Sequence, residues 1–206
     1  MESFLQRILA YTVSMLPGVL AAAMLFFCLR PWRRRRLREA SLVSGGLREV
    51  CLLCLFLFSG GMAALTLLPD PTWFWSWMHG YWTPLFGAWA LPVRYRVNLL
   101  PFSQGDSLVN LLGNLVMFMP FGLSLPLLWR GWNGRRVLLA DLAITGAIEC
   151  WQLLIGRFFD VDDILLNTLG VLCGFWLWRG MDRCLPKGLR QLRCKRWKVR
   201  VEPCQP

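Results

Sequence analysis

Polar residues that could do chemistry recur inside the longest apolar stretches of the sequence. Between residues 137 and 155 they follow one another at intervals of four, four and three, as Asp141, Thr145, Glu149 and Gln152. These intervals place the four side chains on a single face of a helix. An ionisable side chain at the centre of a bilayer costs roughly 2.5 to 3.5 kcal/mol on insertion scales, and by default it marks a functional site. If this helix crosses a membrane, its polar stripe is a candidate site.

Two further stretches carry polar residues at helical spacing. They contribute Asn110 and Asn114 in one stretch, and Asp160, Asp162, Asp163 and Asn167 at the start of the other. Asp163 and Asn167 share a helix face with Gly170 and Gly174. The two glycines predict that a neighbouring helix approaches this face closely. Three helices therefore have polar faces that could meet.

The elements that carry these residues are apolar enough to cross a membrane. Of the 206 residues, 56% are hydrophobic and 17% are charged, whereas about a quarter would be charged in a soluble domain. Five runs approach the thickness of a bilayer, namely 8–29, 50–68, 108–129, 137–155 and 164–178. The last run covers only about 22 Å, so it must draw in flanking residues or thin the bilayer locally.

We therefore predict an all-α integral membrane helical bundle with about five transmembrane helices. Residues 1–69 form a two-helix hairpin with a basic loop. Residues 70–180 form a region of three transmembrane helices preceded by an aromatic outer loop, and residues 181–206 form a basic tail.

The basic residues predict the orientation of this bundle. Nineteen of the 23 Lys and Arg residues lie between the first and second runs, between the third and fourth, or after the fifth. The positive-inside rule places these segments in the cytoplasm, with the N-terminus outside and the C-terminus inside. The net charge of +11 is then a topology signal and an attraction to anionic lipid heads, and we expect no nucleic-acid partner.

On this topology, polar residues of three helices lie at one depth. Asn114, Glu149 and Asn167 fall about 5 to 9 Å below the outer ends of their helices. The shared depth favours one outward-facing polar pocket. The alternative is a structural network, in which amides bond across helices and Arg157 pairs with an aspartate. Asp141 is the exception, because we place it in the first turn at the cytoplasmic end, where the helix dipole favours a carboxylate.

The predicted outer loop, residues 69–107, is aromatic in its first half. Its rings belong to Trp73, Phe74, Trp75, Trp77, Tyr81, Trp82, Phe86 and Trp89. Such rings settle at the bilayer interface, and a platform for a lipid chain is the sharper alternative. The apolar segment 98–102 is too short to span, and a re-entrant path requires that protein cover its backbone.

Three motifs resemble the VanZ-like family of small membrane proteins, which is named for a teicoplanin-resistance protein. They are Asn98-Leu-Leu-Pro-Phe102, Asn110-Leu-Leu-Gly-Asn114 with Phe118-Met-Pro-Phe-Gly122, and Glu149-x-x-Gln152 followed by the stretch from Gly156 to Gly170. The resemblance covers roughly residues 94–178. It implies a bacterial multi-pass protein of the plasma membrane, whose named relative lowers susceptibility to teicoplanin, a glycopeptide with a lipid tail.

The motif residues coincide with the pocket predicted from depth. We therefore expect the ligand-binding residues to be Asn98, Asn110, Asn114, Glu149, Gln152, Arg157, Asp160, Asp163 and Asn167. We expect no cofactor and no metal centre, although the aspartates could hold a divalent ion against a phosphate.

Three functions fit these residues. A non-catalytic envelope protein would bind a lipid-linked cell-wall component or a lipoglycopeptide among the membrane lipids. A membrane enzyme would act on a lipid head group or a lipid-linked phosphate, with Arg157 holding an anion and Glu149 or Asp163 moving a proton. A transporter is disfavoured, because the sequence has no detectable internal repeat and the pocket is confined to the outer half. We prefer the first hypothesis and leave catalysis open.

Overall fold

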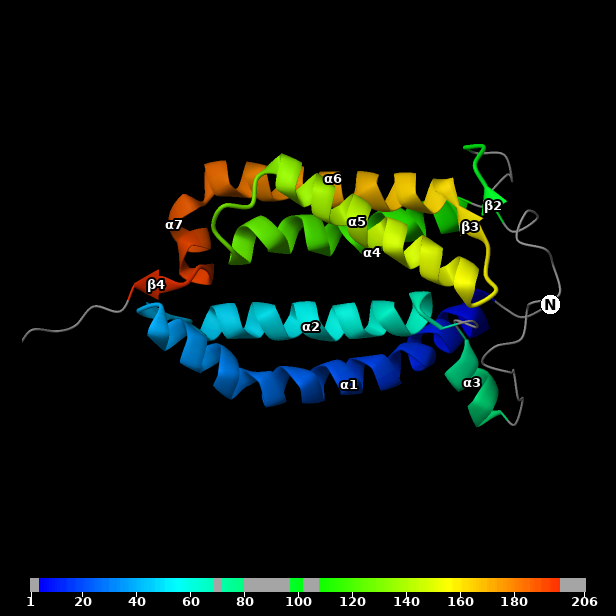
Figure 1. The fold of residues 1–206 in the computed structure, drawn as a ribbon, viewed down its shortest axis with the longest axis horizontal. Coiled ribbons are helices and arrows are strands. Elements are labelled where there is room, and N and C mark those ends of the chain that lie inside the picture. Colours follow the sequence, from blue (N-terminus) through cyan, green and yellow to red (C-terminus); the bar gives the residue numbers. More distant parts are fainter. Residues whose placement is uncertain (1–3, 69–71, 80–96, 102–107, 197–206) are drawn as a thin grey trace, which may run out of the picture.

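A computed structural model describes residues 4–68, 72–79, 97–101 and 108–196 of the chain. Five helices in this part are long and apolar enough to cross a membrane, which confirms the predicted all-α membrane bundle. They are α1 (Phe4–Glu39), α2 (Gly46–Thr66), α4 (Leu108–Leu128), α5 (Gly134–Leu154) and α6 (Val161–Cys184). α1 packs along α2, and both α4 and α5 pack along α6 (Figure 1).

Short elements gather at the two ends of the bundle (Figure 1). At the end predicted to face outward, which we call the outer end, lie α3 (Trp73–Met78), β2 (Val97–Asn98) and β3 (Phe159–Asp160). At the opposite, basic end lie β1 (Leu42–Val43), α7 (Pro186–Leu189), a 3-10 turn (Arg190–Leu192) and β4 (Lys195–Arg196). β2 pairs with β3 in parallel, and β1 pairs with β4 in antiparallel.

Much of the aromatic outer loop, and with it the question of a lipid platform, lies outside the described residues. Its described part contains the six-residue helix α3. In the motif that follows the loop, Asn98 belongs to β2, and the side chains of Leu99 and Leu100 are exposed.

Glycines set the spacing between α4 and α6. A Cβ atom added to Gly170 would collide with the backbone carbonyl of Leu115, and one added to Gly174 would collide with that of Met119. The predicted close approach of a helix to this face is therefore confirmed. It brings the polar residues of α4 within reach of those at the start of α6.

α6 is longer than its apolar run. The run 164–178 covers about 22 Å, whereas the 24 residues of the helix extend about 36 Å. Asp160 caps the helix, since its side chain accepts a hydrogen bond from the backbone N–H of Asp162 at 3.0 Å. Asp162 and Asp163 form part of the first turn, where the helix dipole stabilises carboxylates. The helix thus reaches spanning length by drawing in flanking residues.

Candidate functional site

The turn between α5 and α6 positions the polar residues of the outer end. Gly156 has a φ of +88°, in the left-handed region that favours glycine. The backbone N–H of Arg157 donates to the carbonyl of Gln152 at 2.8 Å, and that of Gly156 donates to the carbonyl of Leu153 at 3.3 Å. These two bonds form a Schellman motif, which ends α5 and reverses the chain. The turn aims Arg157 toward α2 and delivers the following residues to β3.

Glu149 lies under this turn and holds the start of α6. Its side chain is only 1% exposed. The carboxylate oxygen Oε2 accepts a hydrogen bond from the backbone N–H of Asp160 at 3.1 Å. A buried N–H without a partner costs free energy, so Glu149 supplies an acceptor that the loop needs.

Asp160 and Asp163 connect α6 to two other elements. The side-chain amide of Asn98 donates to Oδ1 of Asp160 at 3.2 Å, alongside the backbone pairing of β2 with β3. The side-chain amide of Asn114 on α4 donates to Oδ1 of Asp163. The first turn of α6 is therefore joined by side chains to β2 and to α4.

Arg157 and Gln152 bind the carboxyl end of α2. The Nη1 atom of Arg157 donates to the carbonyl of Leu65 at 3.0 Å and lies 3.4 Å from the carbonyl of Thr66. The side-chain amide of Gln152 donates to the same Thr66 carbonyl at 3.1 Å. The last carbonyls of a helix lack partners within it and carry its negative dipole end, so a guanidinium is well placed there.

Trp151 contributes a third link to the end of α2, and it is not among the residues predicted for the site. Its indole N–H donates to the carbonyl of Leu67 at 2.9 Å. The available signal was its position, since tryptophan near a helix end is typical of the bilayer interface.

The structure thus brings most of the predicted ligand-binding residues into one network at the outer end. Its members form bonds to one another or to backbone groups, and they are Asn98, Asn114, Glu149, Gln152, Arg157, Asp160 and Asp163. Asn167 lies deeper on α6 and is buried. The side chain of Asn110 lies outside the described residues. Amides therefore bond across helices, as the structural alternative predicts, and the hydrogen bonds of Arg157 described above go to backbone carbonyls of α2.

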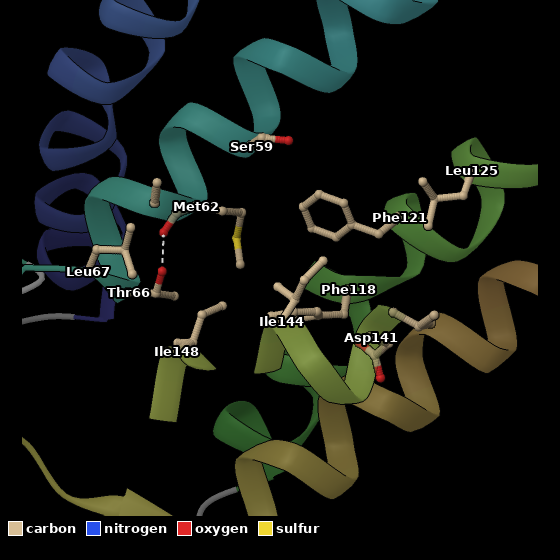
Figure 2. A pocket seen from close by; sticks show the side chains of 12 residues that line it. Ser59, Met62, Thr66, Leu67, Phe118, Phe121, Leu125, Asp141, Ile144 and Ile148 are labelled. Atoms are coloured by element: carbon tan, nitrogen blue, oxygen red, sulfur yellow. Dashed lines mark hydrogen bonds between the residues drawn. The ribbon is translucent and has the colours of Figure 1, made fainter. Parts of the chain in front are cut away.

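A cavity of about 330 Å³ lies among α2, α4, α5 and α6 (Figure 2). Its walls are mostly apolar, with Met62 from α2, Leu67 directly after it, Phe118 from α4, and Ile144 and Ile148 from α5. Thr66, whose carbonyl binds Gln152 and Arg157, also lines the cavity. The cavity therefore adjoins the polar network at the outer end of α2.

Asp141 lines the same cavity, and its predicted position in the first turn of its helix is wrong. The apolar run begins at Val137, but α5 begins at Gly134, and the side chain of Asn133 caps it by accepting from the N–H of Arg136 at 2.9 Å. Asp141 therefore lies about 10 Å along the helix from its first residue, beyond the reach of the dipole of the first turn.

The environment of Asp141 is enclosed. Asp141 is 6% exposed, and its Oδ2 atom has no hydrogen-bond partner among the described residues. Oδ1 of Asn167 on α6 also has no partner in the described part of the chain. The apolar interior thus contains two polar oxygen atoms whose bonding is incomplete, which is the condition under which a ligand, ion or water gains most by binding.

The described residues form no group of three or more His, Cys, Asp and Glu side chains suited to a metal ion. What the arrangement can offer chemically is an apolar cavity that contains one carboxyl group and ends below a polar network.

The family model described as VanZ/LLP1 matches residues 18–182, which includes the larger part of α1 and all of α2 as well as the motif region. No curated protein and no solved structure matches the chain.

Proposed function

Because this chain belongs to the VanZ-like family of multi-pass membrane proteins, we propose that it binds an amphiphile of the cell envelope within the plasma membrane. The ligand is a lipid-linked or lipidated molecule whose apolar chain enters the cavity and whose polar part meets the outer end. Binding of this kind would alter how a lipoglycopeptide such as teicoplanin reaches its target.

The observation that carries the proposal is the cavity itself. Its volume of about 330 Å³ falls at the lower end of the range for small-molecule sites. Apolar side chains dominate its walls, so an alkyl or isoprenoid chain would fit along them, while the open oxygen of Asp141 would pair with a polar group of the ligand or with water. Thr66, whose carbonyl binds the outer network, supplies a polar group at one end, and Asp141 supplies another.

The hydrogen bonds of the network favour binding over catalysis. The two catalytic candidates both have structural partners, since Glu149 accepts from the backbone of Asp160 and Asp163 accepts from Asn114. An enzyme acting on a lipid head group or a lipid-linked phosphate would need one of these carboxylates to contact its substrate instead.

Binding can be tested in lipid nanodiscs with teicoplanin and with a radiolabelled polyprenyl phosphate. Ile148→Phe narrows the cavity, and we expect it to weaken binding of both probes. Leu142→Phe makes a similar addition at a site on the same helix that is 43% exposed and does not line the cavity, so it is the matched control. Equal binding by the two variants would overturn the proposal, as would equal affinity for teicoplanin and vancomycin, which lacks the lipid tail.

A cellular test follows from the family. Expression in a susceptible Gram-positive host should raise the inhibitory concentration of teicoplanin more than that of vancomycin. Ile148→Phe should remove the protection while its abundance in the membrane stays normal. If Glu149→Gln or Asp163→Asn abolishes function in abundant, folded protein and the wild type turns over a lipid phosphate, the enzyme hypothesis replaces the binding hypothesis.

A further inference from the structure

A second pocket, of about 350 Å³, lies at the basic end, where the end of α1, the start of α2 and the residue after α4 meet. Part of its wall is apolar, with Leu29, Leu52, Phe56 and Trp129. The rest is charged and includes Arg33, Arg36, Arg48 and Glu49. The pocket thus combines an apolar wall with an excess of positive charge.

The pocket is lined by three arginines and one carboxylate, that of Glu49. Nη2 of Arg33 lies 2.8 Å from Oε2 of Glu49, and Nη1 of Arg48 lies 4.0 Å from Oε1 of the same carboxylate. Ser44 donates to Oε1 of Glu49 at 2.6 Å and accepts from Arg48 at 3.1 Å. One carboxylate therefore serves two guanidinium groups.

The two guanidinium groups are also held in place and only partly hydrogen-bonded. The residue Arg48 is 5% exposed, and its guanidinium lies 5.9 Å from the ring centre of Trp129. The guanidinium of Arg33 lies 4.2 Å over the ring of Phe26. Within the described residues, Nε of Arg48 and both Nε and Nη1 of Arg33 have no hydrogen-bond partner. A buried cation with open donors is costly unless an anion completes its shell.

We propose that this pocket binds an anionic phospholipid from the leaflet at the basic end. The phosphate meets Arg33, Arg36 and Arg48, because guanidinium groups bind phosphate through charge-assisted hydrogen bonds. An acyl chain lies along Leu29 and Phe56. A soluble anion would leave this apolar wall unused, whereas a phospholipid uses both halves. The exposed basic residues of the same helix, Arg34 and Arg35, attract a negatively charged membrane surface.

The test measures lipid binding to the purified full-length chain by native mass spectrometry and by thermal unfolding in a neutral detergent. Phosphatidylglycerol should remain bound and raise the melting temperature, whereas phosphatidylcholine should do so weakly. Arg33→Gln should weaken phosphatidylglycerol binding by about tenfold or more, as expected for a charge-assisted hydrogen bond.

Two further variants make the result decisive. Arg36→Gln changes an exposed residue that lines the pocket, so it decides the question if Arg33→Gln fails to fold. Arg35→Gln removes the same charge from the same helix outside the pocket and should retain nearly full binding. Equal losses in Arg35→Gln and Arg36→Gln would overturn the proposal, because they would indicate attraction by charge alone. Displacement of the lipid by millimolar glycerol phosphate would overturn it too, because the pocket would then serve a soluble anion.

Discussion

The two ends of the bundle bury charged residues in opposite ways. At the outer end, Arg157 donates to backbone carbonyls of α2, and Glu149 accepts from a backbone amide. At the basic end, Arg33 and Arg48 share one carboxylate, and several of their N–H groups have no partner among the described residues. Burying a polar group demands a partner in both cases. At the outer end, the chain itself supplies these partners. At the basic end, N–H groups of Arg33 and Arg48 are left that an anionic lipid could bind.

The close packing of α6 against α4 beneath the outer network should be the most sensitive to substitution. Gly170→Ala places a Cβ atom against the carbonyl of Leu115, so α4 and α6 must separate and Asn114 must move away from Asp163. We expect a loss of about 3 kcal/mol in the free energy of unfolding, at the upper end for overpacking. Unfolding in mixed micelles measures it. Gly146→Ala, where an added Cβ atom meets nothing within 4 Å, should cost far less, and an equal cost would contradict the packing argument.

Removal of the Arg157 guanidinium, which caps the end of α2, should have the second largest effect on stability. Arg157→Ala should lower the free energy of unfolding by about 2 kcal/mol, because carbonyls of Leu65 and Thr66 lose donors in a partly buried setting. The loss should be the same in neutral detergent and in anionic lipid, since the partners belong to the chain. Arg135→Ala, at an exposed position, is the control. If anionic lipid restored the stability lost in Arg157→Ala, the outer end would also bind lipid, and the proposed difference between the two ends would be wrong.

Substitutions of Glu149 test whether this residue has a structural role at the outer end. Glu149→Leu removes the acceptor for the backbone N–H of Asp160 and should cost about 1 to 2 kcal/mol, whereas Glu149→Gln keeps an acceptor oxygen and should cost less. Hydrogen exchange of the Asp160 amide should quicken in the Leu variant and change little in the Gln variant. Exchange that quickens equally in both would show that the charge, and not merely the acceptor, is required.

The sequence predicts positions along a helix better than it predicts partners. The polar stripe of α5 follows from spacing alone, and Thr145, Glu149 and Gln152 are all buried. The partner of Glu149 is a backbone amide reached through the turn at Gly156, and the partners of Arg157 lie on α2, about ninety residues earlier. No spacing rule reports contacts of that kind.

The error at Asp141 has a physical cause of the same type. Hydropathy finds the start of an apolar run, and this run starts at Val137. The helix starts three residues earlier, because Asn133 caps it and Arg135 and Arg136 are good helix formers. Those three residues move Asp141 out of the first turn and into the cavity wall.

Arg33→Gln should have a small effect on stability without lipid and a larger one when anionic lipid is present. In neutral detergent Arg33→Gln should change the free energy of unfolding by about 0.5 kcal/mol or less, because the loss of the ion pair with Glu49 is offset by removal of a buried cation whose donors are open, and Glu49 keeps Ser44 and Arg48. With phosphatidylglycerol present, the wild type should gain stability through binding and Arg33→Gln should gain much less. The two stabilities therefore diverge only when the anionic lipid is added. A large loss without lipid would mean that the cluster at the basic end is already complete, like the network around Arg157.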